Sequence, residues 1–204
     1  MSEDGVFEPF GDAARRARLP EGADTRAVLE ALRRVPGVMD ALVSERHALV
    51  TFDPGAPPEG EERALQRALS EQGARPPARE HRVRVRYGAE DIDDVARVTG
   101  LPPAEVVARH ADATYVVALV GFLPGFAYLR GLDPLLVVPR RSSPRPRIPA
   151  LSVAVAGPYS AVYPFASPGG WNLLGVAVDF TPFDPCSGAA LGLGDRVRFV
   201  AEPS

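Results

Sequence analysis

One stretch, residues 121–171, constrains the fold more than any other part of the chain, because glycines and prolines recur in it between aromatic residues and arginines. Proline fixes φ and removes a backbone donor, whereas glycine permits positive φ and close backbone approach. Apolar segments at Leu135–Val138 and Ile148–Val155 flank the proline-arginine run, so that run is embedded in a core. This position argues against a proline-rich ligand for an SH3-type domain. The stretch therefore predicts ordered loops shaped to hold a ligand.

Composition excludes several kinds of chemistry. All 23 basic residues are arginine, so the chain has no P-loop lysine, no Schiff-base lysine and no lysine to carry biotin or pyridoxal phosphate. Cys186 is the only cysteine, which excludes a disulfide scaffold and a cysteine-rich zinc site. A net charge of −3 provides no field that would favour nucleic acid or an acidic membrane. We also expect no metal site, since no His-Glu-x-x-His or Cys-x-x-Cys spacing occurs.

Three features predict a cytoplasmic location. The first residues, Met1–Gly5, contain neither the basic nor the apolar segment of a secretory leader. No apolar run approaches the length that spans a membrane. A single cysteine fits a reducing compartment.

The first half of the chain predicts a small α+β domain. Alternating patterns predict four strands, which end at Leu19 or lie at Val38–Ser44, Ala48–Phe52 and Arg82–Tyr87. Helical patterns begin at Asp24 and surround Leu65, so the order is strand, helix, strand, strand, helix and strand. This order is the split β-α-β pattern of a ferredoxin-like fold. We therefore expect a ferredoxin-like domain over residues 1–86.

The second half predicts a β-barrel over residues 87–204. Asp91 and Pro103 begin two helices, and short strands separated by turns then run from Tyr115–Val120 to Arg196–Val200. Many short strands with few helices favour a closed or nearly closed barrel. The acidic residues that begin the first helix are typical of a helix N-terminus, whose dipole they complement, and not of a metal site.

Two features of this half are ambiguous from the residues alone. His110 ends the helix that leads into the Tyr115–Val120 strand, where a histidine either interacts with the helix dipole or has a functional role. The pair Gly169-Gly170 forms either an ordinary turn or a backbone nest that holds an anion.

Four arginines lie among the prolines of the 139–149 run, at positions 140, 141, 145 and 147. Guanidinium groups held this way suit a carboxylate or a phosphate, although a solvated basic loop has the same composition. Trp171, the only tryptophan, directly follows Gly169-Gly170 and is either a core residue or a pocket wall.

Several short motifs occur in one order along the chain: Gly121-Phe-x-Pro-Gly-Phe-x-Tyr-Leu, Pro144-Arg-x-Arg-Ile-Pro149, Tyr163-Pro, Ser167-Pro-Gly-Gly-Trp171 and Phe183-Asp-Pro185. Together they resemble the carboxyltransferase-subdomain family. Its members include the B subunit of bacterial 5-oxoprolinase, allophanate hydrolase subunit 1 and the Kip inhibitor of sporulation histidine kinases.

The resemblance implies an α+β protein with an N-terminal ferredoxin-like domain and a cyclophilin-like barrel. It also implies a heteromer with a C-subunit-like partner of cyclophilin-like fold and with a third, metal-dependent component. Such an assembly would use ATP to open the lactam of 5-oxoproline to glutamate, with no biotin on this chain. Two alternatives are a Kip-like inhibitor that binds a histidine kinase, and a carboxyltransferase-like component of a urea or allophanate pathway.

The resemblance also implies a substrate pocket in the barrel. His110 would be a general acid or base, or would orient the neighbouring loop. Arginines would neutralise a carboxylate or phosphate, glycines would supply N–H donors, and aromatic rings would wall the lactam. The residues expected to bind substrate are Phe122, Pro124, Gly125, Phe126, Tyr128, Arg140, Arg145, Arg147, Tyr163, Ser167, Pro168, Gly169, Gly170 and Trp171.

The chain departs from the family pattern at three places. Tyr87–Ile92 is shorter than the usual glycine-rich turn, and Pro149–Ser152 contains leucine where glycine is usual. Gly175–Val178 replaces the usual Gly-Arg-Thr-Pro. The last difference predicts the loss of a charged and a hydroxylic side chain close to the pocket.

Overall fold

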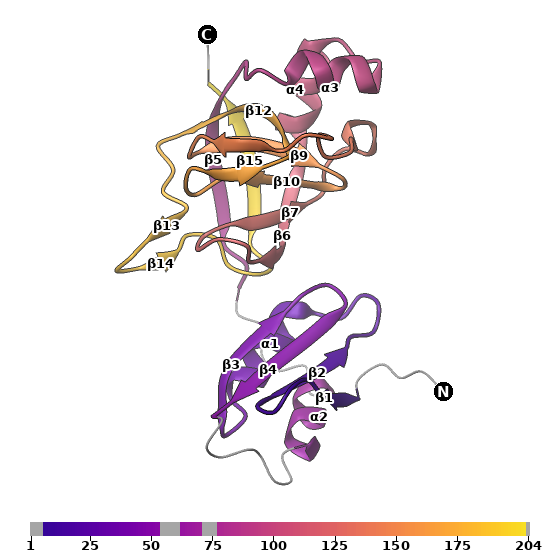
Figure 1. Cartoon of the computed structure of the whole chain (residues 1–204), viewed down its shortest axis with the longest axis vertical. Helices are drawn as coiled ribbons and strands as arrows, with labels where there is room; N and C mark the ends of the chain where they lie inside the picture. The colour runs from indigo at the N-terminus through magenta and orange to yellow at the C-terminus, as the bar shows by residue number, and fades with distance from the viewer. Residues whose placement is uncertain (1–5, 54–61, 71–76, 203–204) are drawn as a thin grey trace. The chain divides into compact units, whose positions relative to one another are not determined.

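The computed structural model describes residues 6–53, 62–70 and 77–202. The chain divides into two compact units, Met1–Pro77 and Ala78–Ser204. Figure 1 shows the first unit in indigo and purple and the second from magenta to yellow.

The N-terminal unit contains a four-stranded antiparallel sheet with the order β1-β2-β4-β3. The strands are Phe7–Pro9, Ala14–Arg18, Val38–Val43 and His47–Phe52 for β1, β2, β3 and β4. Side chains on β4 alternate, with Ala48, Val50 and Phe52 buried. This alternation places one face of the sheet on the core.

Two helices bury the apolar residues that the sequence pattern indicated. In α1 (Thr25–Arg33), the carboxylate of Asp24 accepts a hydrogen bond from the backbone N–H of Ala27 at 3.1 Å and so begins the helix. Its buried face includes Val28 and Leu32. The second helix, α2 (Glu62–Ser70), buries Leu65 and Ala68 and contacts α1.

The expected strand order is present only in part. Strands β2 and β3 are joined through α1 and have β4 between them, which is the split β-α-β arrangement. The fourth strand of the sheet, however, is β1, which precedes α1. The strand predicted at Arg82–Tyr87 is β5 (Glu80–Tyr87), and it belongs to the second unit. Alternation identifies a half-buried strand but not the sheet that it joins, so the boundary lies near residue 77 and not at 86.

The C-terminal unit is a closed barrel with the strand order β10-β7-β6-β15-β5-β12-β9. Neighbouring strands are antiparallel except for β15 and β5, which are parallel along six residue pairs. The remaining barrel strands are β6 (Thr114–Val120), β7 (Ala127–Arg130), β9 (Ser152–Ala156), β10 (Tyr159–Val162), β12 (Asn172–Val178) and β15 (Arg196–Ala201). The predicted barrel is thereby confirmed.

Two helices, α3 (Ile92–Thr99) and α4 (Pro103–Asp112), lie together at one end of the barrel (Figure 1). A short 3₁₀ turn, η1 (Pro134–Leu136), contacts both. Two small two-stranded sheets lie outside the barrel: β8 (Arg145–Ile148) with β11 (Ser167–Gly169), and the hairpin of β13 (Phe183–Asp184) with β14 (Gly188–Ala189).

Strand β9 has both faces buried, and the side chains on one face are larger than those on the other. Val153 and Val155 point into the barrel core, whereas Ala154 and Ala156 belong to a second apolar cluster with aromatic side chains. Successive side chains of a strand point to opposite faces, so this second cluster lies on the outer wall of the barrel. Small outward residues leave room there for large rings.

No helix within the described residues is long and apolar enough to cross a membrane.

Candidate functional site

A pocket of about 270 Å³ opens over the outer wall of the barrel, above the cluster that contains Ala154 and Ala156. We call it the aromatic pocket. Its volume lies just below the usual range for small-molecule sites, which begins at about 300 Å³. It is lined by Phe122, Phe126, Tyr128, Arg140, Pro144, Tyr163, Pro168, Gly169, Gly170 and Trp171.

The walls of the aromatic pocket are rings packed edge to face around Phe126. The centroid of Phe126 lies 5.0 Å from that of Tyr128, 5.3 Å from that of Tyr163 and 5.7 Å from that of Trp171. Such contacts are favourable beyond the area that they bury. The rings therefore form a rigid surface that a flat, partly apolar ligand can contact.

Two glycines allow the loops around the aromatic pocket to pack closely against neighbouring residues. A Cβ at Gly169 would lie 2.6 Å from the hydroxyl of Tyr163, so any side chain there would displace this ring. Gly125 has a φ of 78°, and a Cβ there would lie 2.6 Å from the carbonyl oxygen of Pro182. Neither Gly169 nor Gly170 has a positive φ, and Gly169 pairs with Arg145 in the two-stranded β8–β11 sheet. Close packing therefore accounts for the glycine at position 169, and the strand pairing of this residue does not fit the anion nest that was one of the two alternatives.

Arg140 is the one charged side chain among the described residues that line the aromatic pocket. Its guanidinium carbon lies 5.9 Å from the centroid of Trp171. The preceding carbonyl, that of Pro139, accepts a hydrogen bond from the side-chain amide of Asn172 at 2.9 Å, which holds the backbone beside this ring. Burial raises the pKa of Tyr163 to about 12, although Arg140 partly opposes the shift. Tyr163 is therefore a neutral hydroxyl at physiological pH.

A buried carboxylate anchors the arginine-proline loop from behind. Asp91 is 1% exposed and accepts hydrogen bonds from Arg141 Nη1 at 2.6 Å and Arg145 Nη2 at 2.7 Å. Its second oxygen accepts the backbone N–H of Leu173 at 2.7 Å. Arg145 Nε also lies 2.8 Å from Glu90 Oε1. Sequence reasoning missed this role, because an acidic residue at a helix start has an ordinary explanation.

The structure brings together nine of the fourteen residues expected to bind substrate, and these are the pocket residues given above except Pro144. Pro144 was not expected to bind substrate. The other five expected residues do not line the aromatic pocket: Pro124, Gly125, Arg145, Arg147 and Ser167.

His110 lies in the barrel core and is 0% exposed. Its Nδ1 is 2.7 Å from the Tyr87 hydroxyl, and its Nε2 is 2.8 Å from Ser160 Oγ. The ring stacks on Phe199 with a centroid distance of 4.7 Å. Burial lowers the pKa of His110 to about 3. A neutral ring that accepts from Tyr87 at Nδ1 donates from Nε2 to Ser160, so both nitrogens are used inside the protein. His110 does not line the aromatic pocket, and this geometry gives it no contact with a ligand there.

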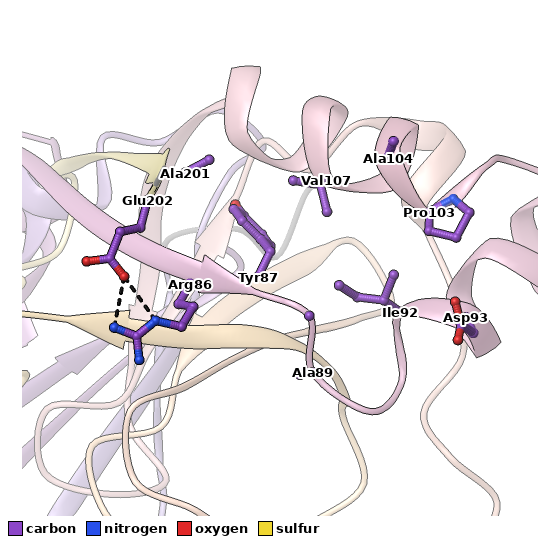
Figure 2. Close-up of a pocket in the computed structure, with 11 residues that line it drawn as sticks. Arg86, Tyr87, Ala89, Ile92, Asp93, Pro103, Ala104, Val107, Ala201 and Glu202 are labelled. Atoms are coloured by element: carbon purple, nitrogen blue, oxygen red, sulfur yellow. Dashed lines mark hydrogen bonds and ion pairs between the residues drawn. The ribbon is translucent and has the colours of Figure 1, made fainter. Parts of the chain in front are cut away.

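A second, larger cavity of about 960 Å³ lies between α3, α4 and the ends of β5 and β15 (Figure 2). Arg86 and Glu202 pair within it, with Nε and Nη2 of Arg86 3.1 and 3.0 Å from Glu202 Oε2. The Tyr87 hydroxyl turns to His110. Asp93 is the other carboxylate at the cavity, so one cation faces two anions. The remaining lining residues are apolar or glycine: Gly88, Ala89, Ile92, Pro103, Ala104, Val107 and Ala201.

The departure at Gly175–Val178 does not alter the aromatic pocket. Val176 is 42% exposed on the outside of the barrel, and Ala177 is buried in the barrel core. Neither residue lines the pocket. Within the described ranges, no group of histidine, cysteine and acidic residues could hold a metal ion.

The C-terminal unit is a closed seven-stranded barrel that fits the cyclophilin-like fold, with a small pocket of aromatic rings and one arginine on its outer wall. The chain belongs to the family of the carboxyltransferase domain, subdomain C and D, whose sequence model matches residues 4–190.

Three similar curated proteins are bacterial 5-oxoprolinase B subunits. The chain is 44% identical over 119 residues to that of Bacillus subtilis (strain 168), a match that covers 56% of this chain and 49% of the relative. It is 44% identical over 117 residues to that of Escherichia coli O157:H7, covering 56% and 53%. The match to the Haemophilus influenzae protein is 40% identical over 121 residues, covering 57% and 56%. The chain spans about half the length of the curated relatives it matches.

Solved structures share the fold over nearly the whole chain. The crystal structure of TTHA0988 is 37% identical, with a TM-score of 0.82 over 94% of this chain and 40% of that one. A conserved uncharacterized protein of Pyrococcus horikoshii is 30% identical, with a TM-score of 0.58 over 98% of both chains. The urea carboxylase of Kluyveromyces lactis is 17% identical, with a TM-score of 0.73 over 97% of this chain and 22% of the enzyme, a likeness of fold alone.

Proposed function

We propose that this chain is the B-subunit-like component of a heteromeric, ATP-dependent 5-oxoprolinase that converts 5-oxo-L-proline to L-glutamate. One observation carries the proposal: a small pocket walled by aromatic rings contains a single arginine among its described lining residues. The similarity to three 5-oxoprolinase B subunits points to the same activity.

The aromatic pocket has the properties that 5-oxoproline requires. The substrate is a five-membered lactam ring with one carboxylate, so it needs a flat apolar contact and one cation. Tyr128 and Trp171 would contact the ring, and Arg140 would pair with the carboxylate. The neutral hydroxyl of Tyr163 would be available as a hydrogen-bond donor.

The isolated chain would bind ATP only weakly, and the complete ATP site would form only in the assembled complex. The chain has no lysine and hence no P-loop lysine to hold the β- and γ-phosphates. Among the described residues that line the large cavity, Asp93 is the only charged group without an oppositely charged partner there, and it would repel a nucleotide. We infer that a C-subunit-like partner of cyclophilin-like fold completes the nucleotide site, and that turnover also requires a third, metal-dependent component.

We also infer that the N-terminal unit is a rearranged ferredoxin-like domain. Its sheet order places β1 beside β2, where the last strand of a ferredoxin-like sheet normally lies. The protein would act in the cytoplasm, where the exposed thiol of Cys186 stays reduced.

The test is reconstitution. The chain is expressed alone, with a C-subunit-like protein, and with both partner proteins, and ADP release is measured with and without 5-oxo-L-proline. We expect a stable heteromer by size-exclusion chromatography and 5-oxoproline-dependent ADP release only from the full assembly. Separate elution of the proteins at micromolar concentration would contradict the proposal. Robust ATP hydrolysis by this chain alone would contradict the inferred division of labour.

A further inference from the structure

A second hollow, of about 300 Å³, lies beside the aromatic pocket, and Arg140 lines both. We call it the polar hollow. It is formed by α3 on one side and by the loop that precedes β8 on the other. Its lining residues are Asp94, Val95, Arg97, Val98, Val138, Pro139, Arg140, Arg141, Ser142, Ser143 and Asn172.

The polar hollow has more positive than negative charge. Three guanidinium groups, those of Arg97, Arg140 and Arg141, face one carboxylate, that of Asp94. Arg97 and Arg141 both pair with Asp94, and the latter contact measures 3.5 Å. Arg141 also bonds to buried Asp91 and is thereby fixed in place. Arg140 has no carboxylate partner among the described residues, so its donors are free for a ligand.

The hollow also offers hydroxyl and backbone donors. Ser142 and Ser143 are exposed in a bend, and within the described part of the chain neither residue donates a hydrogen bond. The bend itself is held in place, because the backbone N–H of Arg141 donates to the carbonyl of Gly170 at 2.8 Å. Free donors on a fixed backbone are pre-organised for an acceptor-rich anion.

We propose that the polar hollow binds a phosphoryl group next to the ring bound in the aromatic pocket, with Arg140 contacting both. A phosphoryl group presents three oxygens and up to two negative charges, which matches several guanidinium and hydroxyl donors better than a carboxylate does. The inference rests on the proposed function, because an ATP-dependent lactam hydrolase must bring a phosphoryl group to its ring substrate. The source is either a nucleotide or a phosphorylated form of the substrate.

Isothermal titration of the full chain with inorganic phosphate, pyrophosphate and ATP, each with and without 5-oxo-L-proline, tests the proposal. We expect saturable phosphate or pyrophosphate binding that weakens at least tenfold in Arg97→Gln and in the double variant Ser142→Ala/Ser143→Ala. Arg97 and both serines lie on the surface, so the variants should fold. Arg147→Ala is the matched control, since Arg147 lies in β8, directly after this loop, and lines neither the polar hollow nor the aromatic pocket.

The ligands distinguish the two sources. ATP binding that responds to the same variants assigns the hollow to a nucleotide phosphate, whereas phosphate binding strengthened by 5-oxo-L-proline assigns it to phosphorylated substrate. Absence of saturable binding of any of the three ligands at about 10 mM would overturn the proposal. Equal weakening by Arg147→Ala would also overturn it. If the variants lose phosphate binding but the assembly does not act on 5-oxo-L-proline, the proposed function fails and the phosphoryl site stands.

Discussion

The aromatic pocket and the large cavity differ most in how their polar groups are used. The large cavity has more than three times the volume, about 960 Å³ against 270 Å³. However, its arginine pairs with Glu202 and its tyrosine hydroxyl bonds to His110. The aromatic pocket presents Arg140 with no carboxylate partner among the described residues. The proposed site for a small anion therefore rests on available donors and rigid rings, and not on cavity volume.

A buried polar residue lies behind the aromatic pocket and another behind the large cavity. We call these two residues, Asp91 and His110, the supports of the two cavities, and they differ in charge. Asp91 lies behind the loop of the aromatic pocket, where its carboxylate accepts hydrogen bonds from three donors, two of them guanidinium groups. His110 lies behind the large cavity as a neutral ring bonded to Tyr87. The first holds two cationic side chains in place, whereas the second holds one hydroxyl. The supports therefore should fail in different ways when they are altered.

The largest effect is expected for Asp91→Ala. Removal of this carboxylate leaves Arg141 and Arg145 without their common acceptor, and loss of one partner of a buried ion pair typically costs about 3–5 kcal/mol. The free energy of unfolding, measured by denaturant titration, should fall by an amount of that order. Asp93→Ala is the matched control, since Asp93 lies on the same helical turn and is exposed.

A loss below about 1 kcal/mol in Asp91→Ala would show that backbone contacts alone hold the loop, and an equal loss in both variants would show that the effect is not specific to the ion pairs of Asp91. The comparison between a charged support and a neutral one would then be wrong.

The next effect concerns catalysis. Arg140→Ala removes the cation of the aromatic pocket, and a hydrogen bond to a charged group contributes about 1.5–3 kcal/mol, so kcat/KM of the assembled complex should fall roughly ten- to a hundredfold. Arg140→Lys should recover only part of this, because an ammonium lacks the planar fork. The melting temperature should stay near that of the wild type in both variants.

Arg147→Ala serves as the control for Arg140, because Arg147 lies outside the pocket. If the two alanine variants lose activity equally, the effect comes from the charge of the loop and not from the pocket. An unchanged kcat/KM in Arg140→Ala would remove the main physical support for the proposed function.

Sequence patterns predicted the barrel and most of the pocket because both depend on local features. Glycines, prolines and aromatic residues mark the loops that form the aromatic pocket, and nine expected residues meet there. The predictions that were wrong concern features that depend on pairing between residues far apart in the sequence. The strand at residues 82–87 has the same alternation in either unit, and only its partners β12 and β15 decide where it belongs.

The functions of individual polar residues were also set by distant partners. Arg145 has the surroundings of a ligand-binding residue in the sequence, yet its guanidinium bonds to an aspartate 54 positions away. Likewise, His110 lies near the motif-bearing loop in sequence, but Ser160 and Tyr87 enclose it in the core. No local pattern distinguishes an arginine or histidine that contacts a ligand from one whose side chain bonds to distant residues inside the protein.

A smaller effect concerns the pH dependence of stability, which should distinguish the neutral support, His110, from the charged one, Asp91. Burial lowers the pKa of His110 from 6.5 to about 3, so below about pH 6.5 the unfolded chain binds a proton that the folded chain does not. The contribution of His110 to stability is therefore complete above pH 6.5 and is lost as pH falls toward 3. His110→Gln should reduce the slope of unfolding free energy against pH by about 1.4 kcal/mol per pH unit in this window.

His47→Gln is the control for this slope, since His47 lies exposed in the β3–β4 hairpin. Denaturant titrations at several pH values between about 4 and 7 measure the slope for all three proteins. If His110→Gln leaves the slope of unfolding free energy against pH unchanged, the His110 ring is protonated in the folded state. His110 would then not be a neutral support.

The smallest effect is expected where the large cavity itself is filled. Ala104→Trp places an indole at the wall of this cavity, on the first turn of α4, and the change in helix propensity costs less than about 1 kcal/mol. If the aromatic pocket is the substrate site, kcat/KM of the assembled complex should stay within about twofold of the wild type, because no residue of the aromatic pocket is altered. Size-exclusion chromatography of the same sample verifies that the complex remains assembled. A tenfold fall in kcat/KM with an intact complex would show that the larger cavity takes part in turnover, despite its paired arginine and its excess of carboxylates.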